Sequence, residues 1–300
     1  MLQSLRRREG RSPDASSSGA LRSARALVVD VGSVSKLRAL LTVGVALAVT
    51  AVSGCIRAPS PLAPQVGGSV GMPHRGVLVG GKMLPKKAEG LAWLRQDDRH
   101  WGLPRFVDTI ERSAAKVARE RPGAVLVVGD LSAKSGGVLL PHLSHRTGRD
   151  VDLLLYMTTL DGVPVASPGF VHVGDDGLAW DPDKKRFLRF DVEREWLLVK
   201  ELVSDPAARV QWIFAHRRIE AMIVEWARAK DEPPELVLRA MEVMLQPNPG
   251  GPHDDHLHVR TACAPDELTT GCEPTGPKRA WLEDAAPAAG AADALAEPAP

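Results

Sequence analysis

The chain has 300 residues, of which 44% are hydrophobic and 25% are charged. This composition is ordinary for a globular protein, and it excludes a chain that is disordered throughout. The formal net charge is +1, from 38 basic and 37 acidic residues, so the sequence predicts no nucleic-acid partner. The length is that of one or two domains.

Residues 1–54 are predicted to be an N-terminal extension and export signal. The uncharged run Ala39–Val52 is shorter than the roughly 20 residues that a membrane-spanning helix needs. It follows two basic residues, Lys36 and Arg38, and ends in small residues, which is the order of a secretory signal. Its exit, Val-Ser-Gly-Cys55, resembles the bacterial lipobox, in which the cysteine is lipidated. We therefore expect an exported, periplasmic lipoprotein, anchored to the outer membrane through Cys55 because no acidic residue follows that cysteine.

The remainder is predicted to be one folded domain between two unstructured segments. Residues 55–75 are mostly rich in Pro, Gly and Ser and are expected to form a flexible tether. Residues 276–300 are rich in Ala and Pro and are expected to form a disordered tail. The folded domain is then expected over residues 76–275.

Hydrophobic periodicity and turn residues predict the elements of this domain. In chain order they are a hairpin over 76–84 that turns at Gly80-Gly81, a helix over 108–120 capped by Asp108, strands over 125–128 and 151–156, a helix over 192–203 after Asp191, a strand over 210–214, a helix around 219–226, a helix from Pro234 to about residue 245, and a strand over 256–260. Helices and short strands mix without a regular βαβ rhythm, so the predicted fold class is α+β.

Five of the nine histidines fall in two short clusters. In the first, His142 and His145 precede Gly148, Asp150 and Asp152. Two ligand atoms on one zinc ion lie within roughly 3.5 Å of each other. A turn at Gly148 would let His145 in a loop meet Asp152 on a strand, and a helix would hold the two too far apart. The spacing therefore predicts a metal site at this turn.

The second cluster holds His253, His256 and His258. On a strand, His256, His258 and Arg260 point to one face, and the apolar residues between them point to the other. One imidazole can then bind a metal while its neighbour handles a proton. Three protein ligands with an open fourth position are typical of catalytic zinc. We interpret the remaining histidines as ordinary surface or core residues: His74, His100, His172 and His216.

Cys263 and Cys272 have eight residues between them, in a loop that contains Pro and Gly. In an exported protein, two nearby cysteines indicate a disulfide. Because Cys55 would carry lipid, no thiol would be left over.

Taken together, these motifs resemble the penicillin-insensitive murein endopeptidases, a family of zinc peptidases related to the D-Ala-D-Ala peptidases and lysostaphin-like enzymes. The resemblance runs from about Val77 to Cys272. It rests on Ser-His-Arg-Thr-Gly-Arg-Asp-Val-Asp, ending at Asp152, on His-Leu-His, ending at His258, and on Val-Gly-Asp-Leu-Ser and Gln-Trp-Ile-Phe between 128 and 214. It implies an antiparallel sheet that carries the zinc ligands, flanked by helices.

Carried over to this chain, the resemblance assigns roles to six residues. Zn²⁺ is bound by His145, Asp152 and His258; the active-site histidines are His256 and His253; and His142 matches a further histidine that some members place near the metal. A second metal position in the family has only weak candidates here, Asp161 and His172.

The implied reaction is hydrolysis of peptidoglycan cross-links, at the D-alanyl–diaminopimelate bond. Zinc would activate a water, and His256, with His253 as the alternative, would act as the general base, because no HExxH glutamate is present. Three aspartates could orient imidazoles, and three arginines could bind substrate carboxylates. These are Asp150, Asp254, Asp255, Arg146, Arg149 and Arg260.

Four alternatives remain at this point. A D,D-carboxypeptidase or dipeptidase of the same superfamily would use the same zinc-dependent hydrolysis on a different peptide bond. A metal phosphohydrolase of the HD type, suggested by His253-Asp254, would need its ligands on helices. An amidohydrolase barrel would need ligands downstream of His258. A lipoprotein that binds zinc or wall peptide would hold the metal without hydrolysis.

Overall fold

The computed structural model describes residues 67–248 and 250–283. The predicted signal, Cys55 and most of the predicted tail lie outside these residues. Within them, we find no helix that combines the length and the apolar character needed to span a membrane.

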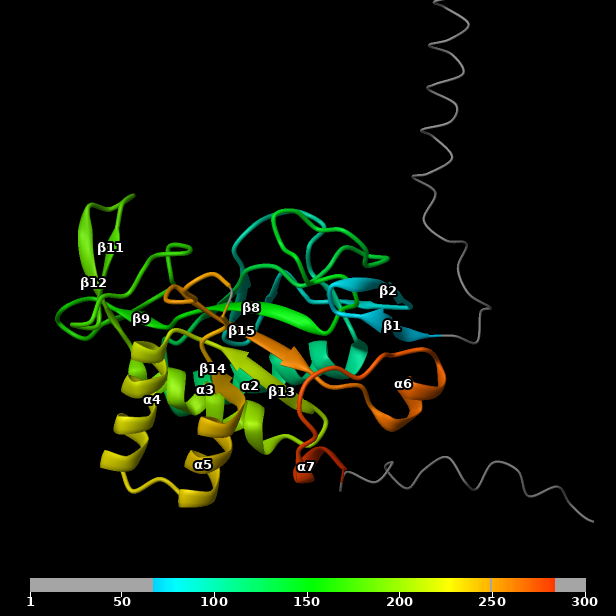
Figure 1. The fold of residues 1–300 in the computed structure, drawn as a ribbon. Helices are drawn as coiled ribbons and strands as arrows, with labels where there is room; N and C mark the ends of the chain where they lie inside the picture. The colour runs from blue at the N-terminus through cyan, green and yellow to red at the C-terminus, as the bar shows by residue number, and fades with distance from the viewer. Residues whose placement is uncertain (1–66, 249, 284–300) are drawn as a thin grey trace, which may run out of the picture. The chain divides into compact units, whose positions relative to one another are not determined.

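A seven-stranded mixed sheet forms the centre of the fold (Figure 1). In spatial order its strands are β14 (Met244–Leu245), β13 (Val210–Phe214), β15 (His256–Thr261), β8 (Asp150–Leu154), β7 (Leu126–Val128), β5 (Leu91–Trp93) and β4 (Lys87–Ala88). Four middle strands, β13, β15, β8 and β7, pair antiparallel with one another, whereas β14 and β5 are added in parallel and β4 pairs antiparallel with β5. The α+β class is confirmed, and the strands that carry predicted ligands, β8 and β15, pair antiparallel within this mixed sheet.

The helices gather on one side of this sheet (Figure 1). They are α2 (Pro104–Glu120), α3 (Val192–Ser204), α4 (Arg217–Ala229) and α5 (Pro234–Val243), with the short α6 (Pro265–Thr269) and α7 (Ala280–Glu283) near the C-terminal end of the described chain. Side chains alternate between the two faces of a strand. One face of β8 and β15 therefore sends Val151, Leu153, Leu257 and Val259, all fully buried, into the core.

Three smaller sheets complete the fold. They are the hairpin of β1 (Gly68–Met72) and β2 (Arg75–Val79), the pair of β3 (Lys82–Met83) and β6 (Trp101–Gly102), and a four-stranded sheet of β9 (Met157–Thr158), β10 (Pro164–Val165), β11 (Leu178–Asp181) and β12 (Arg186–Phe190). The last sheet projects from one end of the molecule (Figure 1). Hydrophobic periodicity did not predict this sheet, because its strands are too short to show a clear alternation.

The predicted hairpin turn at Gly80-Gly81 is wrong. Strand β2 pairs with the preceding strand β1 instead of with the residues that follow it. After Gly80, which has a left-handed φ of 66°, the chain continues into β3, which pairs with β6. The folded region also extends beyond the expected 76–275 at both ends. At the start, the Gly71 backbone bonds to Gly271 and Glu273. At the end, Leu282 is buried.

The predicted helices are confirmed with shifted ends. Helix α2 begins at Pro104 instead of Asp108, because proline preorganises the first turn, and Asp108 pairs with Lys82 instead of capping. Helix α3 begins as expected after Asp191, whose side chain accepts a hydrogen bond from the Arg194 amide. Helix α5 stops at Val243, where the chain becomes the edge strand β14.

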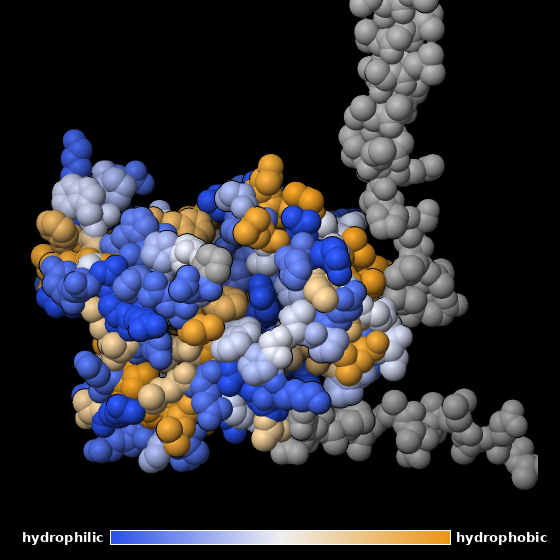
Figure 2. Space-filling view, in the orientation of Figure 1, coloured by the Kyte–Doolittle hydropathy of each residue, from blue (hydrophilic) through white to orange (hydrophobic). Residues whose placement is uncertain are grey.

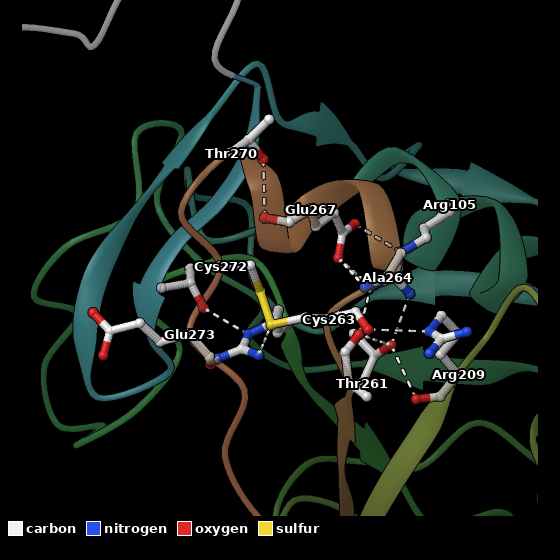
Figure 3. Close-up of a disulfide and its surroundings, with 12 residues drawn as sticks. Arg105, Arg209, Thr261, Cys263, Ala264, Glu267, Thr270, Cys272 and Glu273 are labelled. Carbon is white, nitrogen blue, oxygen red and sulfur yellow. Dashed lines mark hydrogen bonds and ion pairs between the residues drawn. A yellow bond between two sulfur atoms is a disulfide. The ribbon is translucent and has the colours of Figure 1, made fainter. Parts of the chain in front are cut away.

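The predicted disulfide between Cys263 and Cys272 is confirmed (Figure 3). It closes a loop that contains α6, and Arg105 of α2 anchors this loop through paired hydrogen bonds to Glu267 (Figure 3). Arg149 is fully buried beside the disulfide and donates to Cys263 Sγ at 2.9 Å. The expectation that Arg149 meets substrate is therefore wrong, since its guanidinium is enclosed by protein.

Candidate metal centre

The register of β8 and β15 places the predicted site on the sheet face opposite the core. Asp152 lies directly across from His258, and Asp150 lies across from Arg260. Because side chains alternate along each strand, all four side chains share one face with His256. The alternation predicted from the sequence is confirmed.

His145 reaches this face from the loop before β8. The loop reverses through two left-handed residues, His145 with a φ of 62° and Gly148 with a φ of 70°. A side chain at Gly148 would put its Cβ 3.0 Å from the Leu103 amide nitrogen, so the close approach requires glycine. A left-handed conformation is unfavourable for a histidine, and such strain is typical of functional sites.

Three atoms from these segments converge. Asp152 Oδ1 lies 3.3 Å from His145 Nε2 and 3.2 Å from His258 Nδ1, and the two imidazole nitrogens are 3.4 Å apart. His145 and Asp152 are almost completely buried, and His258 is nearly so. Ligands at 2.0–2.1 Å from a tetrahedral zinc ion are separated by about 3.3 Å, so the spacing fits that ion.

The hydrogen bonds around the two imidazoles define which nitrogens face inward as acceptors. His145 Nδ1 lies 2.6 Å from the Leu131 carbonyl oxygen, which can only accept, so Nδ1 carries the proton and Nε2 a lone pair. His258 Nε2 lies 2.8 Å from the Asp150 carboxylate, which in the same way leaves a lone pair on Nδ1.

Two lone pairs and a carboxylate therefore face one another, and neither oxygen of Asp152 has a hydrogen-bond partner among the described residues. A buried cluster of acceptors is unfavourable unless a cation or a proton lies between them. These lone-pair atoms therefore fit a metal ion. The unpartnered oxygens of Asp152 support this independently of the sequence motif.

The electrostatics of the two carboxyls show that positive charge is needed beside them. Burial raises the pKa of Asp152, and only positive charge at its neighbours His145 and His258 outweighs burial and holds that pKa well below its usual range. Burial also raises the pKa of Asp150, and Arg260 and His258 outweigh it in the same way. Both groups are therefore carboxylates at neutral pH.

His256 lies at the rim of the cluster. Its Nδ1 is 2.5 Å from Asp255 Oδ1, and its Nε2 is 3.5 Å from Asp152 Oδ1. The edge of the imidazole packs on the Phe170 ring, with centroids 5.2 Å apart. The carboxylate of Asp255 accepts the Nδ1 proton, so Nε2 keeps a lone pair and faces the candidate ligands.

His253 stands behind His256, with ring centroids 4.9 Å apart. Its backbone is left-handed, with a φ of 51°, and its Nδ1 donates to the Gly251 carbonyl oxygen at 2.7 Å. Burial lowers the pKa of His253 to about 4. His253 is therefore neutral at physiological pH and can accept a hydrogen bond through Nε2.

His142 also joins the site. Its Nε2 lies 2.7 Å from Asp130 Oδ2, and its Nδ1 lies 3.7 Å from Asp152 Oδ2. Sequence reasoning missed the part played by Asp130, which is buried and also accepts from Arg95. No local signal in the sequence identified this residue, because Asp130 meets His142 only when their two loops come together.

The candidates for a second metal are not brought together. His172 is exposed and binds Asp254, which also pairs with Arg218. His172, Asp254 and Asp255 could hold a cation, but Asp161 belongs to no group of potential metal ligands in the described chain. Of the three aspartates expected to orient imidazoles, Asp150 contacts His258, Asp255 contacts His256, and Asp254 contacts His172, which is outside the centre.

A buried cluster of two imidazoles and a carboxylate, with a further imidazole at its rim, is typical of metal-dependent hydrolases. Residues 69–281 match the family model described as penicillin-insensitive murein endopeptidase. The chain therefore belongs to the penicillin-insensitive murein endopeptidase family.

Three curated relatives, each named penicillin-insensitive murein endopeptidase, are similar to this chain. The Klebsiella pneumoniae (strain 342) protein is 28% identical over 79% of this chain and 82% of its own length. The protein from Escherichia coli O157:H7 is 28% identical over 80% of this chain and 81% of its own length. That from Escherichia coli strain K12 / DH10B is 27% identical, over 84% and 88%.

Proposed function

We propose that this protein is a zinc-dependent endopeptidase that hydrolyses the D-alanyl–diaminopimelate cross-links of peptidoglycan. The observation that carries this proposal is the convergence of His145 Nε2, Asp152 Oδ1 and His258 Nδ1 at separations of 3.2–3.4 Å. Family membership, together with the names of the relatives, supports murein as the substrate.

The three converging atoms would hold the zinc ion, which would supply Lewis acidity at the scissile carbonyl. Asp150 keeps His258 in the tautomer that ligation needs, and the Leu131 carbonyl does the same for His145. The two anchors also fix the directions of both imidazoles, so the site is preorganised.

His256 is the proposed general base. Its Nε2 would take a proton from the attacking water and return it to the leaving amine nitrogen. The carboxylate of Asp255 stabilises the imidazolium that forms between these transfers. His253, which burial keeps neutral, would hold a hydrogen bond to the reacting oxygen instead of moving the proton.

The location proposed for this reaction is the periplasm. Peptidoglycan lies there, and the predicted signal and lipid anchor at Cys55 would place the domain within reach of it. The disulfide between Cys263 and Cys272 is consistent with an oxidising compartment.

Digestion of purified cross-linked muropeptide dimers by the full chain, followed by mass spectrometry, tests the proposal. We expect dimers to become monomers, and a chelator to stop the reaction. His256→Ala should retain zinc and lose activity by about 10²–10⁴-fold. His74→Ala, at an exposed turn, is the control and should match the wild type.

Other products would favour the alternatives. Release of terminal D-alanine alone, with dimers left intact, would indicate a D,D-carboxypeptidase. Zinc binding with neither reaction would indicate a non-catalytic zinc-binding lipoprotein. Unchanged turnover of His256→Ala would reject that residue as the base.

A further inference from the structure

The sheet face that carries the proposed metal ligands continues beyond His258 to Arg260 and to two aromatic residues of the neighbouring strand β13. Across the β13–β15 pairing, Phe214 lies opposite His258 and Trp212 lies opposite Arg260. Both aromatic side chains are half-buried. The next polar side chain along β15 on this face is Arg260, two residues and about 6.7 Å of strand from the proposed ligand.

Two contacts fix the guanidinium of Arg260. Its Nε donates to Asp150 Oδ1 at 2.6 Å, the same oxygen that His258 Nε2 contacts. Its central carbon lies 5.2 Å from the centroid of the Phe214 ring, in a cation–π arrangement. The group is thus held beside the metal centre with its direction set.

The two terminal nitrogens of Arg260 remain available. They donate to no other protein group in the described part of the chain, and the side chain is 18% exposed. A guanidinium carries four of its five donors on these nitrogens, arranged to meet both oxygens of a carboxylate. Of the other arginines near the site, Arg95 pairs with Asp130 and Arg149 binds Cys263, whereas Arg146 is half-buried and its Nε has no hydrogen-bond partner among the described residues.

The proposed substrate offers one carboxylate close to the scissile bond. In a D-alanyl–diaminopimelate cross-link, the carbon that bears the scissile nitrogen also bears a free carboxylate. On the acyl side, the alanine offers only a methyl group. A carboxylate two bonds from the scissile nitrogen would lie a few ångströms from the metal centre, and Arg260 projects from the same sheet face two residues, or about 6.7 Å of strand, beyond the proposed ligand His258.

We propose that Arg260 binds this carboxylate and so selects cross-links whose amine-side residue is unamidated. The inference rests on the proposed function, because that function identifies the scissile bond. Phe214 and Asp150 preorganise the guanidinium, so little side-chain freedom is lost when the carboxylate binds.

The test compares two muropeptide dimers that differ only in whether this carboxylate is free or amidated. The wild type should cleave the free form with a kcat/KM about 10–100-fold higher than that of the amidated form. In Arg260→Gln, the ratio of kcat/KM for the free form to kcat/KM for the amidated form should fall to about one. Arg260→Lys should keep part of the preference, because a single ammonium cannot make the paired contact.

Arg189→Gln is a matched control, because it removes one exposed positive charge from β12 and should leave the preference intact. Zinc content is measured in each variant, since Arg260 shares Asp150 with a proposed ligand. An equal loss on both dimers in Arg260→Gln would overturn the inference and assign Arg260 a purely structural role.

A binding experiment separates this inference from the proposed function. Titration of both dimers into His256→Ala, and into the same variant with Arg260→Gln, measures the preference without turnover. The first variant should bind the free dimer about 10–100-fold more tightly, and the second should bind both equally. If the wild type cleaves neither dimer, the proposed function fails, while this affinity ratio still supports or overturns the role of Arg260.

Discussion

The two faces of strands β8 and β15 carry side chains of opposite character. One face places four aliphatic side chains in a core shared with the helices, where all are fully buried. The other face carries Asp150, Asp152, His256, His258 and Arg260, which interact through hydrogen bonds and charge.

The contrast shows how the fold supports an unfavourable site. Burying carboxylates and acceptor nitrogens costs free energy, and burying aliphatic side chains offsets that cost. Because the same backbone carries both faces, rigid packing on one side fixes the positions of donor atoms on the other. Changes on the two faces should therefore have separable effects.

The largest effect is expected from the polar face. His258→Ala removes one of three proposed ligands, so bound zinc and hydrolysis should both be lost, with activity reduced by at least about 10³-fold. Metal analysis of the purified variant, alongside the muropeptide assay, checks this. Retention of both zinc and activity would exclude His258 as a ligand.

The apolar face should respond in stability instead of metal content. Leu153→Ala leaves a cavity in the core and should lower the free energy of unfolding by about 2–5 kcal/mol. Urea denaturation measures the loss, and Leu238→Ala, at an exposed position on α5, should change it by less than about 0.5 kcal/mol. Zinc stoichiometry of the folded Leu153→Ala protein should equal that of the wild type, and a lower value would show that the faces are not separable.

A smaller effect on metal binding is expected from Asp150, which contacts the proposed ligand His258. Asp150→Asn keeps the shape of the side chain but weakens its hold on His258 and Arg260, so zinc affinity should fall by about 10–100-fold. Competition with a chromophoric chelator measures the affinity. An unchanged affinity would mean that Asp150 does not orient the ligand.

Glu195, on helix α3, is a fully buried carboxyl group. One of its oxygens has no hydrogen-bond partner among the described residues. Burial raises the pKa of Glu195 to about 8, above its value of 4.5 in an unfolded chain. The stability that neutral Glu195 confers is complete below pH 4.5 and is lost as the pH rises toward 8.

Glu195→Gln should remove this pH dependence. The variant should melt at least about 5 °C above the wild type at pH 9 and differ little at pH 4.5. Thermal unfolding across this pH range measures the difference. A constant difference between the two proteins at every pH would show that Glu195 does not titrate in this range.

Much of the site could be predicted from the sequence because its spacing is local. Alternation along a strand sets which residues share a face, so His256, His258 and Arg260 could be grouped without coordinates. The turn at Gly148 was also predictable, since only a reversal brings His145 to Asp152. The same local rules found Pro234 at the start of α5 and the cysteine pair.

Other features depend on pairings between distant segments. The hairpin turn was misplaced because β2 could pair with either flank, and only the docking of β3 on β6 decides between them. Arg149 and Arg260 both suggested substrate contact. Only the tertiary structure buries Arg149 against the disulfide and leaves Arg260 open beside Phe214. The role of Asp130 likewise appears only when its loop meets His142.

The sequence by itself determined the kinds of candidate ligand, their order along the chain and, for Asp152 and His258, the strand face on which each lies, because these follow from local periodicity. The tertiary structure decided the register of β8 against β15, and with it the separations of 3.2–3.4 Å between the donor atoms. The physical reason is that register is set by the packing of the aliphatic face, which involves helices far away in the sequence.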